Sequence, residues 1–287
     1  MKKCLLLVNS FKENALSLSE EIADFLLQKN VESHSFVYDG KVALDDESET
    51  AKVDFSGYDF VITLGGDGTV LFAGRSCASL RIPVFSINLG EFGFLAEISV
   101  ESWKGELEKF LKGQLGISQR HLIHAEVIRE GKSLASFTGL NDAVISSEPT
   151  AKLINLKVAY NRAVLGPFRA NGIIVSTATG STAYSAAAGG PIIDPSLNAL
   201  VLTPVSSFSL SARPLVFNSN GEIAITVLPS RFDISLTVDG QESIQLKTDD
   251  VIILDVPEDK ALLAGASQEN FYSALRSKLN WSGGPLC

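Results

Sequence analysis

The chain has 287 residues, of which 45% are hydrophobic and 20% charged, and its formal net charge is −9. This length allows one large domain or two ordinary ones, with a sizeable buried core. The acid excess argues against a surface for nucleic acid or anionic membranes, although backbone amides and a metal ion can still neutralise nucleotide phosphates locally. No stretch approaches the roughly 18 consecutive apolar residues that span a bilayer, and the apolar start is too short for a signal peptide. We therefore expect a cytoplasmic protein with no nucleic-acid and no membrane partner.

The cysteines give a second indication of compartment. Cys4, Cys77 and Cys287 are an odd, scattered set without a C-x-x-C pair. This spacing fits a reducing environment and favours neither a disulfide framework nor a zinc site.

Strands and helices alternate over roughly the first 115 residues. The apolar patterns predict, in chain order, a strand over 3–10, a helix carrying Ile22 and Leu26, strands over 31–37 and 60–64, a helix over 70–78 and a strand over 82–88. Such alternation is typical of a parallel sheet with crossover helices.

The pattern changes after residue 115. Short strands separated by turn signals such as Asp239-Gly240 follow one another. The expected strands cover 123–129, 143–146, 154–160, 173–176, 221–227, 234–238 and 251–255. The fold class is therefore an α/β N-terminal domain with a parallel sheet plus an all-β, sandwich-like C-terminal domain. We place the domains at 1–115 and 116–265, and we expect the helical segment 266–287 to pack back on the first domain.

The most informative motif is the turn Gly65-Gly66-Asp67-Gly68-Thr69, between an expected strand and an expected helix. Glycines let backbone N–H groups approach phosphate oxygens, and the helix N-terminus favours negative charge. A carboxylate beside bound phosphates would repel them unless it bound a metal ion or held an acceptor hydroxyl. Phosphoryl transfer needs both of these functions. The alternative is a tight turn in which Asp67 only caps the helix. A dinucleotide-binding fingerprint starting at Gly66 fails, because it would need glycine at Leu71.

A second segment, 171–195, is rich in glycine and hydroxyl side chains around one aromatic residue, Tyr184. Small side chains permit close approach of a ligand, and hydroxyls can bond to an adenine edge or to ribose. The alternative is a surface loop in which Tyr184 fills a gap in the core.

Six motifs in order make the chain resemble the NAD kinases. Beyond the two segments above, the resemblance rests on 88–95 (Asn-Leu-Gly-Glu-Phe-Gly-Phe-Leu), Leu140-Asn141-Asp142, 211–215 (Ser-Ala-Arg-Pro-Leu) and Asp239-Gly240-Gln241. It covers about residues 60 to 241. The first turn alone is shared with lipid kinases, whereas the ordered set is far more specific.

The resemblance implies a reaction and its partners. ATP would donate its γ-phosphate, with a divalent cation such as Mg²⁺, to the 2′-hydroxyl of the adenosine ribose of NAD, giving NADP and ADP. The site would lie between the two domains of a homo-oligomer, a dimer or a tetramer. Two other functions stay open: a lipid or sphingoid kinase that shares the first turn, and a non-catalytic NAD(P)-sensing module, which the retained Asp67 disfavours.

The resemblance also implies residue roles. Asp67 matches the family's general base or hydroxyl-orienting aspartate, and Asn141 with Asp142 matches the pair that grips the ribose hydroxyls. The phosphate end would be formed by Gly65, Gly66, Gly68 and Thr69. The expected NAD contacts are Asp67, Gly68, Phe94, Asn141, Asp142, Lys152, Arg169, Asn171, Thr179, Thr182, Ala183, Tyr184, Ser185, Ala187 and Gln241. No residue is assigned to the metal.

Three positions depart from the family pattern. Asn171 replaces an aspartate associated with the nicotinamide amide, Ala178 replaces a proline, and Phe208 replaces a histidine. Asparagine still accepts a hydrogen bond but brings no charge, so recognition of the nicotinamide end is expected to differ. We expect none of the three to abolish activity.

Overall fold

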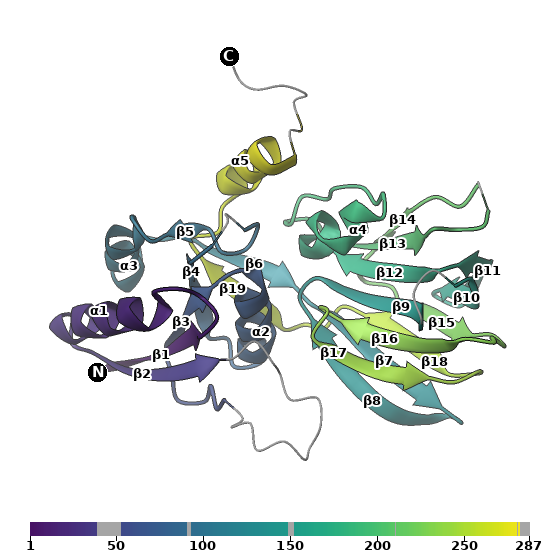
Figure 1. The fold of residues 1–287 in the computed structure, drawn as a ribbon, viewed down its shortest axis with the longest axis horizontal. Coiled ribbons are helices and arrows are strands. Elements are labelled where there is room, and N and C mark those ends of the chain that lie inside the picture. The colour runs from purple at the N-terminus through teal and green to yellow at the C-terminus, as the bar shows by residue number, and fades with distance from the viewer. Residues whose placement is uncertain (39–52, 91–92, 149–151, 210, 280, 282–287) are drawn as a thin grey trace. The chain divides into compact units, whose positions relative to one another are not determined.

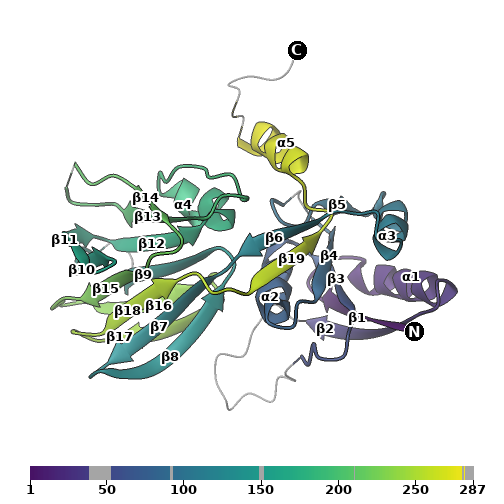
Figure 2. The ribbon, with the colours of Figure 1, turned by 180° about the vertical axis from the view of Figure 1, so that it is seen from behind.

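A computed structural model describes residues 1–38, 53–90, 93–148, 152–209, 211–279 and 281 (Figures 1 and 2). Residues 91–92 of the motif 88–95 lie outside this set. The described chain forms two compact units, one of 1–119 with 260–281 and the other of 120–259. Each unit has its own sheet system and its own core.

The first unit is built on one mostly parallel sheet. Its strands are β1 (Lys2–Asn9), β2 (Val31–Tyr38), β3 (Phe60–Gly65), β4 (Pro83–Asn88), β5 (Ile98–Ser99), β6 (Ile117–His121) and β19 (Lys260–Ala264). Their order is β2-β1-β3-β4-β19-β6, and β5 pairs with β4. The pairs among β1 to β5, and the pair of β19 with β4, are parallel. The carboxyl ends of β1, β3 and β4 therefore meet at one edge of the sheet.

Four helices belong to this unit: α1 (Ala15–Gln28), α2 (Asp67–Ala78), α3 (Trp103–Leu111) and α5 (Gln268–Leu279). One face of the sheet, with Leu6, Ile62 and Phe85, forms a common core with Ile22 of α1 and Leu107 of α3. The helix α2 packs against β3, β4 and β19. Burial of these apolar side chains is the main force that holds helices and sheet together.

The second unit is a sandwich of two antiparallel sheets. The first sheet has the order β11-β10-β15-β18-β7-β8 and the second the order β14-β13-β12-β9-β16-β17. The bounds are β7 (Ile123–Arg129), β8 (Lys132–Gly139), β9 (Asp142–Glu148), β10 (Ile154–Tyr160), β11 (Ala163–Ala170), β12 (Gly172–Thr177), β13 (Ala199–Val205), β14 (Leu215–Asn218), β15 (Ile223–Val227), β16 (Asp233–Val238), β17 (Glu242–Leu246) and β18 (Val251–Asp255). Aliphatic side chains of both sheets, among them Val127, Leu156, Val175 and Leu236, form one core. The predicted fold class is thus confirmed.

The observed units divide at 119/120 and 259/260, whereas the sequence placed the changes at 115/116 and 265/266. The difference arises from β6 and β19, which the sequence did not predict as strands and which complete the first sheet (Figure 2). In β19, Leu262 pairs with Pro83 of β4. An apolar strand pattern does not say which sheet the strand joins, so only tertiary pairing decides this.

The sequence also missed several further elements, among them α3 and β13. Both are held by tertiary contacts, since Trp103 of α3 packs edge-on against Phe25 of α1 at 5.4 Å, and β13 lies between β12 and β14.

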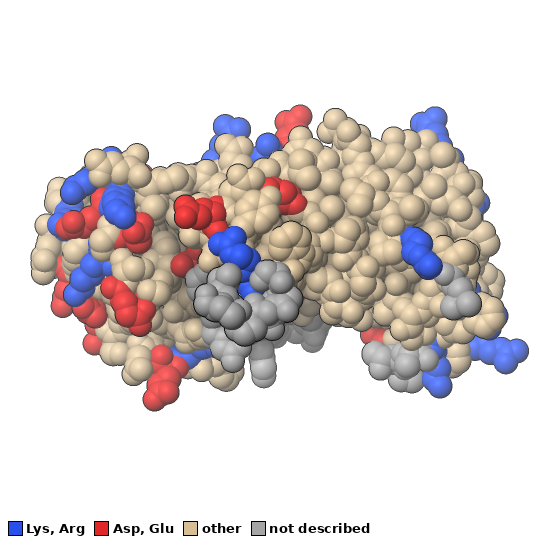
Figure 3. Space-filling view, turned by 90° about the horizontal axis from the view of Figure 1, so that it is seen from above, with Lys and Arg blue, Asp and Glu red and all other residues tan. Residues whose placement is uncertain are grey.

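Charged side chains of both signs are interspersed over the α/β unit on the face drawn in Figure 3, while the β-rich unit shows mostly uncharged surface there. Among the described residues, no helix is long and apolar enough to cross a membrane.

Candidate functional site

The glycine-rich turn connects β3 to α2. Gly65 ends the strand, Gly66 is the helix N-cap, and α2 begins at Asp67. A Cβ on Gly65 would lie 2.9 Å from Cβ of Thr69, whose buried hydroxyl accepts a hydrogen bond from Nδ2 of Asn9 at 3.2 Å. Around Gly66, in contrast, there is open space within 4 Å. The turn therefore packs tightly on its inner side and leaves backbone accessible on its outer side, as phosphate binding requires.

The Asp67 carboxylate binds the backbone of a distant segment. Its Oδ2 accepts the N–H of Phe94 at 2.9 Å, and its Oδ1 accepts those of Leu95 at 3.1 Å and Ala96 at 3.0 Å. The close approach depends on Gly93, where a Cβ would lie 2.5 Å from Cγ of Asp67. A carboxylate offers about four acceptor positions, so one on Oδ2 is left for a further donor. The alternative, in which Asp67 only caps α2, does not fit, because its carboxylate accepts the N–H groups of residues 94–96 outside that helix.

Phe94 points toward α5. Its ring lies 6.3 Å from that of Phe271, and Nζ of Lys278 lies 5.1 Å above it. The N–H of Ser267 donates to Glu97 at 3.3 Å. The segment that carries the expected adenine neighbour is therefore attached to α5 by its side chain and to Asp67 by its backbone.

A second aspartate makes the same kind of contact in the β-rich unit. Oδ2 of Asp239 accepts the N–H of Leu140 at 2.8 Å, and its Oδ1 accepts those of Asn141 at 2.7 Å and Asp142 at 3.2 Å. Three consecutive amides just before and at the start of β9 thus share one carboxylate.

The carbonyls of the same segment are bound from the other side. The N–H of Thr177 donates to the Asn141 carbonyl at 2.8 Å, and its Oγ1 donates to that of Leu140 at 2.7 Å. Gly180 lies so close that a Cβ there would be 2.5 Å from the Asn141 carbonyl carbon and 2.6 Å from its Cα. The backbone that carries the Asn141–Asp142 pair is therefore fixed on both sides.

Asp142 is a buried carboxylate. It is 5% exposed, and no hydrogen bond joins its carboxylate to another described residue. Burial and, as the smaller cause, the negative charge of Asp239 together raise the pKa of Asp142 to about 7. Directly opposite on β12, the hydroxyl of Ser176 is fully buried and has no hydrogen-bond partner among the described residues. Buried polar groups in native proteins are normally satisfied, and the described residues do not satisfy the Ser176 hydroxyl.

The segment expected to hold adenosine forms the short helices η1 (Thr179–Thr182) and α4 (Tyr184–Ala187). Tyr184 is 48% exposed, so it does not fill a gap in the core. Ser185 is fully buried and shares a 2.9 Å hydrogen bond with Thr203 of β13. It therefore holds α4 in place, while Thr182 and Ala183 lie at the partly exposed junction of the two helices.

The remaining expected contacts lie on strands and turns around this segment. Nζ of Lys152 lies 5.8 Å above the ring of Phe232. Arg169 lies 4.9 Å above the ring of Phe208, whose N–H donates to the Arg169 carbonyl at 2.9 Å. Phe208, one of the three departures, thus stacks on an expected NAD contact.

Backbone bonds hold two further expected contacts in the sandwich. Asn171 bridges two strands, donating its N–H to Val205 and accepting that of Ser147. Gln241 closes the β16–β17 turn with a 2.9 Å bond from its N–H to the Val238 carbonyl. Ala187 is the exposed last residue of α4.

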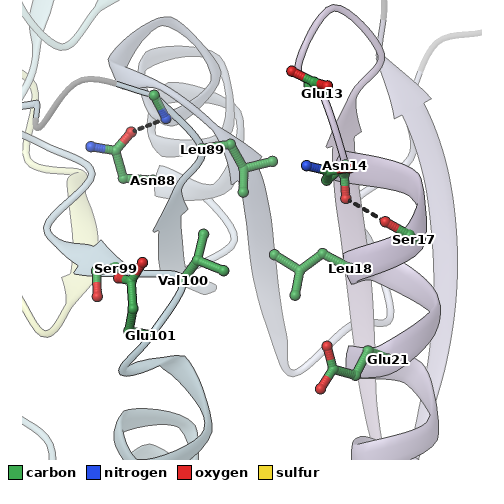
Figure 4. A pocket seen from close by; sticks show the side chains of 11 residues that line it. Glu13, Asn14, Ser17, Leu18, Glu21, Asn88, Leu89, Ser99, Val100 and Glu101 are labelled. Atoms are coloured by element: carbon green, nitrogen blue, oxygen red, sulfur yellow. Dashed lines mark hydrogen bonds between the residues drawn. The ribbon is translucent and has the colours of Figure 1, made fainter.

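A pocket of about 510 Å³ lies in the first unit between α1 and the segments after β4 and at β5 (Figure 4). Its floor is apolar and its rim acidic, with Leu18, Leu89, Val100, Glu13, Glu21 and Glu101 among its lining residues. None of its described lining residues is Lys or Arg, and Lys104 pairs with Glu21 from outside the lining. This charge does not match that of a triphosphate.

The sequence assigned no role to three residues that shape these sites: Gly93, Gly180 and Asp239. Asp239 was placed in a turn and in the motif Asp239-Gly240-Gln241 without a role of its own, and the Asp-Gly signal predicts the turn after β16 correctly. Nothing in the local sequence shows that its carboxylate reaches residues 140–142.

A strand-to-helix glycine turn that carries an aspartate, as in the first unit, is typical of nucleotide-dependent phosphotransferases. Comparison with known proteins agrees. Residues 4–115 match the family model of the ATP-NAD kinase N-terminal domain, and residues 140–264 match that of the C-terminal domain. The chain therefore belongs to the ATP-NAD kinase family, which confirms the resemblance found in the sequence.

Relatives and solved structures support this membership. An NAD kinase of Treponema denticola is 49% identical over 284 residues, which are 99% of this chain and 98% of the relative. The fold is similar to that of a yeast NADH kinase complexed with NADH, with TM-score 0.80 and 20% identity over 99% of this chain and 89% of the other. It is also similar to an Archaeoglobus fulgidus NAD kinase in complex with ATP, with TM-score 0.75 and 23% identity over 98% of this chain and 99% of the other.

Proposed function

We propose that the protein transfers the γ-phosphoryl group of ATP to the 2′-hydroxyl of the adenosine ribose of NAD, giving NADP and ADP. The new bond joins the 2′-oxygen to the γ-phosphorus. The bond from that phosphorus to the β–γ bridging oxygen breaks, and the hydroxyl proton leaves to a carboxylate or to water. Such a reaction depends mainly on positioning and on neutralisation of charge.

The observation that carries the proposal is the buried Asp142 carboxylate without a hydrogen-bond donor. The two hydroxyls of a ribose are donors of the kind it lacks. With Asn141 beside it on a fixed backbone, the pair would hold both ribose oxygens and so distinguish the 2′ from the 3′ position. A sugar without neighbouring hydroxyls would leave Asp142 unsatisfied, which penalises the wrong ligand.

Asp67 would orient the acceptor hydroxyl. Three backbone N–H groups already occupy its carboxylate, and the acceptor position left on Oδ2 suits a single hydroxyl donor. The same three bonds keep the carboxylate in one place, which favours attack in line with the γ-phosphate. The glycine turn would bind the phosphates at the N-terminus of α2, where Gly68 is exposed, while the Thr69 N–H is bonded to the Gly66 carbonyl.

A magnesium ion would enter with the triphosphate. Among the described residues, no group of three or more His, Cys, Asp or Glu side chains could hold a metal ion. Mg²⁺ does not need a cluster of protein ligands, because it keeps several waters and is commonly bound through substrate phosphates with only one or two carboxylates. When bound, the ion would neutralise charge on the transferring phosphate.

We also propose that the protein is a homo-oligomer. The edge strands β11 and β14 expose apolar side chains, Val164 at 60% and Val216 at 52%. Exposed apolar edges are normally covered by another chain or otherwise blocked. Light scattering on the purified protein would give the mass of a dimer or larger assembly, and a monomer mass would refute this part.

The reaction is tested by incubating purified protein with ATP, Mg²⁺ and NAD and following NADP with a coupled dehydrogenase. Asp67→Asn is expected to lower kcat by about 100-fold, because an amide keeps only one acceptor oxygen. Asp59→Asn is a matched control, since Asp59 also accepts a backbone N–H, that of Lys3 at 2.7 Å. EDTA should stop turnover and excess Mg²⁺ restore it. No NADP from the folded wild-type protein, or full activity of Asp67→Asn, would overturn the proposal.

A further inference from the structure

Asp239 lies in the turn of residues 239–241 between β16 and β17. Its φ is 53° and that of Gly240 is 66°, as in a type I′ hairpin turn. The turn is closed by the bond from the Gln241 N–H to the Val238 carbonyl. None of these features needs the carboxylate of Asp239, so the side chain is available for another purpose.

That carboxylate extends the sheet beyond the end of its strand. The pairing of β16 with β9 ends at Val238 opposite Ala143, and the N–H of Asp239 then donates to the Asp142 carbonyl at 2.9 Å. Here β16 turns away, and the N–H groups of residues 140–142 lose their partner strand. The Asp239 carboxylate accepts all three of them. Backbone donors without a partner are costly, so one side chain replaces several ladder bonds.

The contact of the Asp239 carboxylate with residues 140–142 also requires glycine at position 139. A Cβ there would lie 2.9 Å from Oδ1 of Asp239 and 2.6 Å from Cγ1 of Val238. Position 139 therefore has no side chain at the point where the Asp239 carboxylate approaches the backbone. With Thr177 holding the carbonyls from the other side, the direction of the Asn141 and Asp142 side chains depends on both supports.

We propose that Asp239 is a positioning residue of the NAD site, which fixes the Asn141–Asp142 pair by binding the N–H groups of residues 140–142. The inference rests on the proposed function, in which this pair holds the ribose hydroxyls. Asp239 acts through the pair and touches neither the phosphates nor the reacting oxygen. Removing it should impair the use of NAD far more than the use of ATP.

Asp239 has a second effect, on charge. The Asp239 carboxylate faces Asp142 from the β16–β17 turn. On β12, the polar residue opposite Asp142 is the uncharged Ser176. No other charged group among the described residues acts on the Asp142 carboxylate. The negative charge of Asp239 opposes ionisation of Asp142. A change that removes this charge therefore also changes the pH at which the pair becomes able to accept hydrogen bonds from ribose.

Two variants separate geometry from charge. Asp239→Asn keeps one acceptor oxygen and removes the charge, so KM for NAD should rise on the order of 10- to 100-fold, with KM for ATP within about twofold of wild type. The acid limb of kcat/KM for NAD should move to lower pH. Asp239→Glu keeps the charge but displaces the oxygens by one methylene, so KM for NAD should rise while the acid limb stays in place. If Asp239→Asn does not fold, the Glu variant alone carries the test of position.

Asp250→Asn is the matched control. Asp250 is a buried aspartate of the same unit and also binds three donors, two from Arg129 and the N–H of Lys247. Its loss should lower stability without a selective change in KM for NAD. The proposal is overturned if the control raises KM for NAD as much as Asp239→Asn does, if KM for NAD and ATP rise together, or if the Glu variant matches wild type. If the wild-type protein made no NADP, the proposed function would fail, and calorimetric titration of NAD into the same variants would still test Asp239.

Discussion

Gly180 gives the sharpest test of how the NAD site is built. In Gly180→Ala the new Cβ would lie 2.5 Å from the Asn141 carbonyl carbon and 2.6 Å from its Cα, where ordinary contact begins near 3.4 Å. These atoms belong to the backbone, so no side-chain rotation relieves the overlap. Either residues 179–182 or the Asn141 backbone must move by about 1 Å to restore ordinary contact.

The cost follows from what holds Asn141. The bonds at risk are the two from Thr177 to the carbonyls of Leu140 and Asn141 and the bond from the Asn141 N–H to Asp239. At about 1 kcal/mol for each, the free energy of unfolding should fall by about 2–4 kcal/mol. A displacement of about 1 Å at a substrate-positioning residue costs on the order of 100-fold in rate. We therefore expect kcat/KM for NAD to fall by about two orders of magnitude.

Urea unfolding and the coupled NADP assay measure the two effects separately. Gly105→Ala is the matched control, because Gly105 is exposed in α3 and has open space within 4 Å. Alanine at this helical position should leave activity unchanged and add about 0.5–1 kcal/mol of stability. Wild-type kcat/KM and wild-type stability in Gly180→Ala would show that the close approach to Asn141 has no role in the site.

Two further outcomes follow from the carboxylates. Gly93→Ala would place a Cβ 2.5 Å from Cγ of Asp67. The kcat at saturating ATP and NAD should therefore fall about 100-fold. A kcat within twofold of wild type would contradict the role given to this contact. The pKa of Asp142 is raised from 3.8 to about 7, so the stability that its protonated form provides is present below pH 3.8 and lost as pH rises to about 7. In urea unfolding, the stability of Asp142→Asn relative to wild type should accordingly grow by about 3 kcal/mol between pH 5 and 8, and a difference independent of pH would refute the burial argument.

Most of the architecture could be predicted from the sequence because it depends on local patterns. Runs of apolar residues placed β1, β3 and β4, and the glycines around Asp67 marked the junction of strand and helix. The Asp239-Gly240 pair placed a turn correctly. The identity of the acceptor came from the ordered motifs and from membership of the family, since the first turn alone specifies only a phosphate site.

The elements that the sequence missed or misassigned depend on partners far away in the chain. Within the first unit, β19 joins β4 across more than half of the chain, and α3 is held by contacts with α1. No local pattern distinguishes such a strand from one that belongs to the sandwich.

By itself the sequence predicted which residue types the proposed site contains: the glycine turn, one aspartate within it and the Asn141–Asp142 pair. Only the tertiary structure decided what the aspartates do with their carboxylates. Asp67 binds amides 27 to 29 residues away, and Asp239 binds amides 97 to 99 residues away. The physical reason is that a carboxylate's partners are set by strand register and by the close approach of backbone at glycines such as Gly93 and Gly139. Neither is encoded in the periodicity of neighbouring residues, because both arise only when distant strands pair.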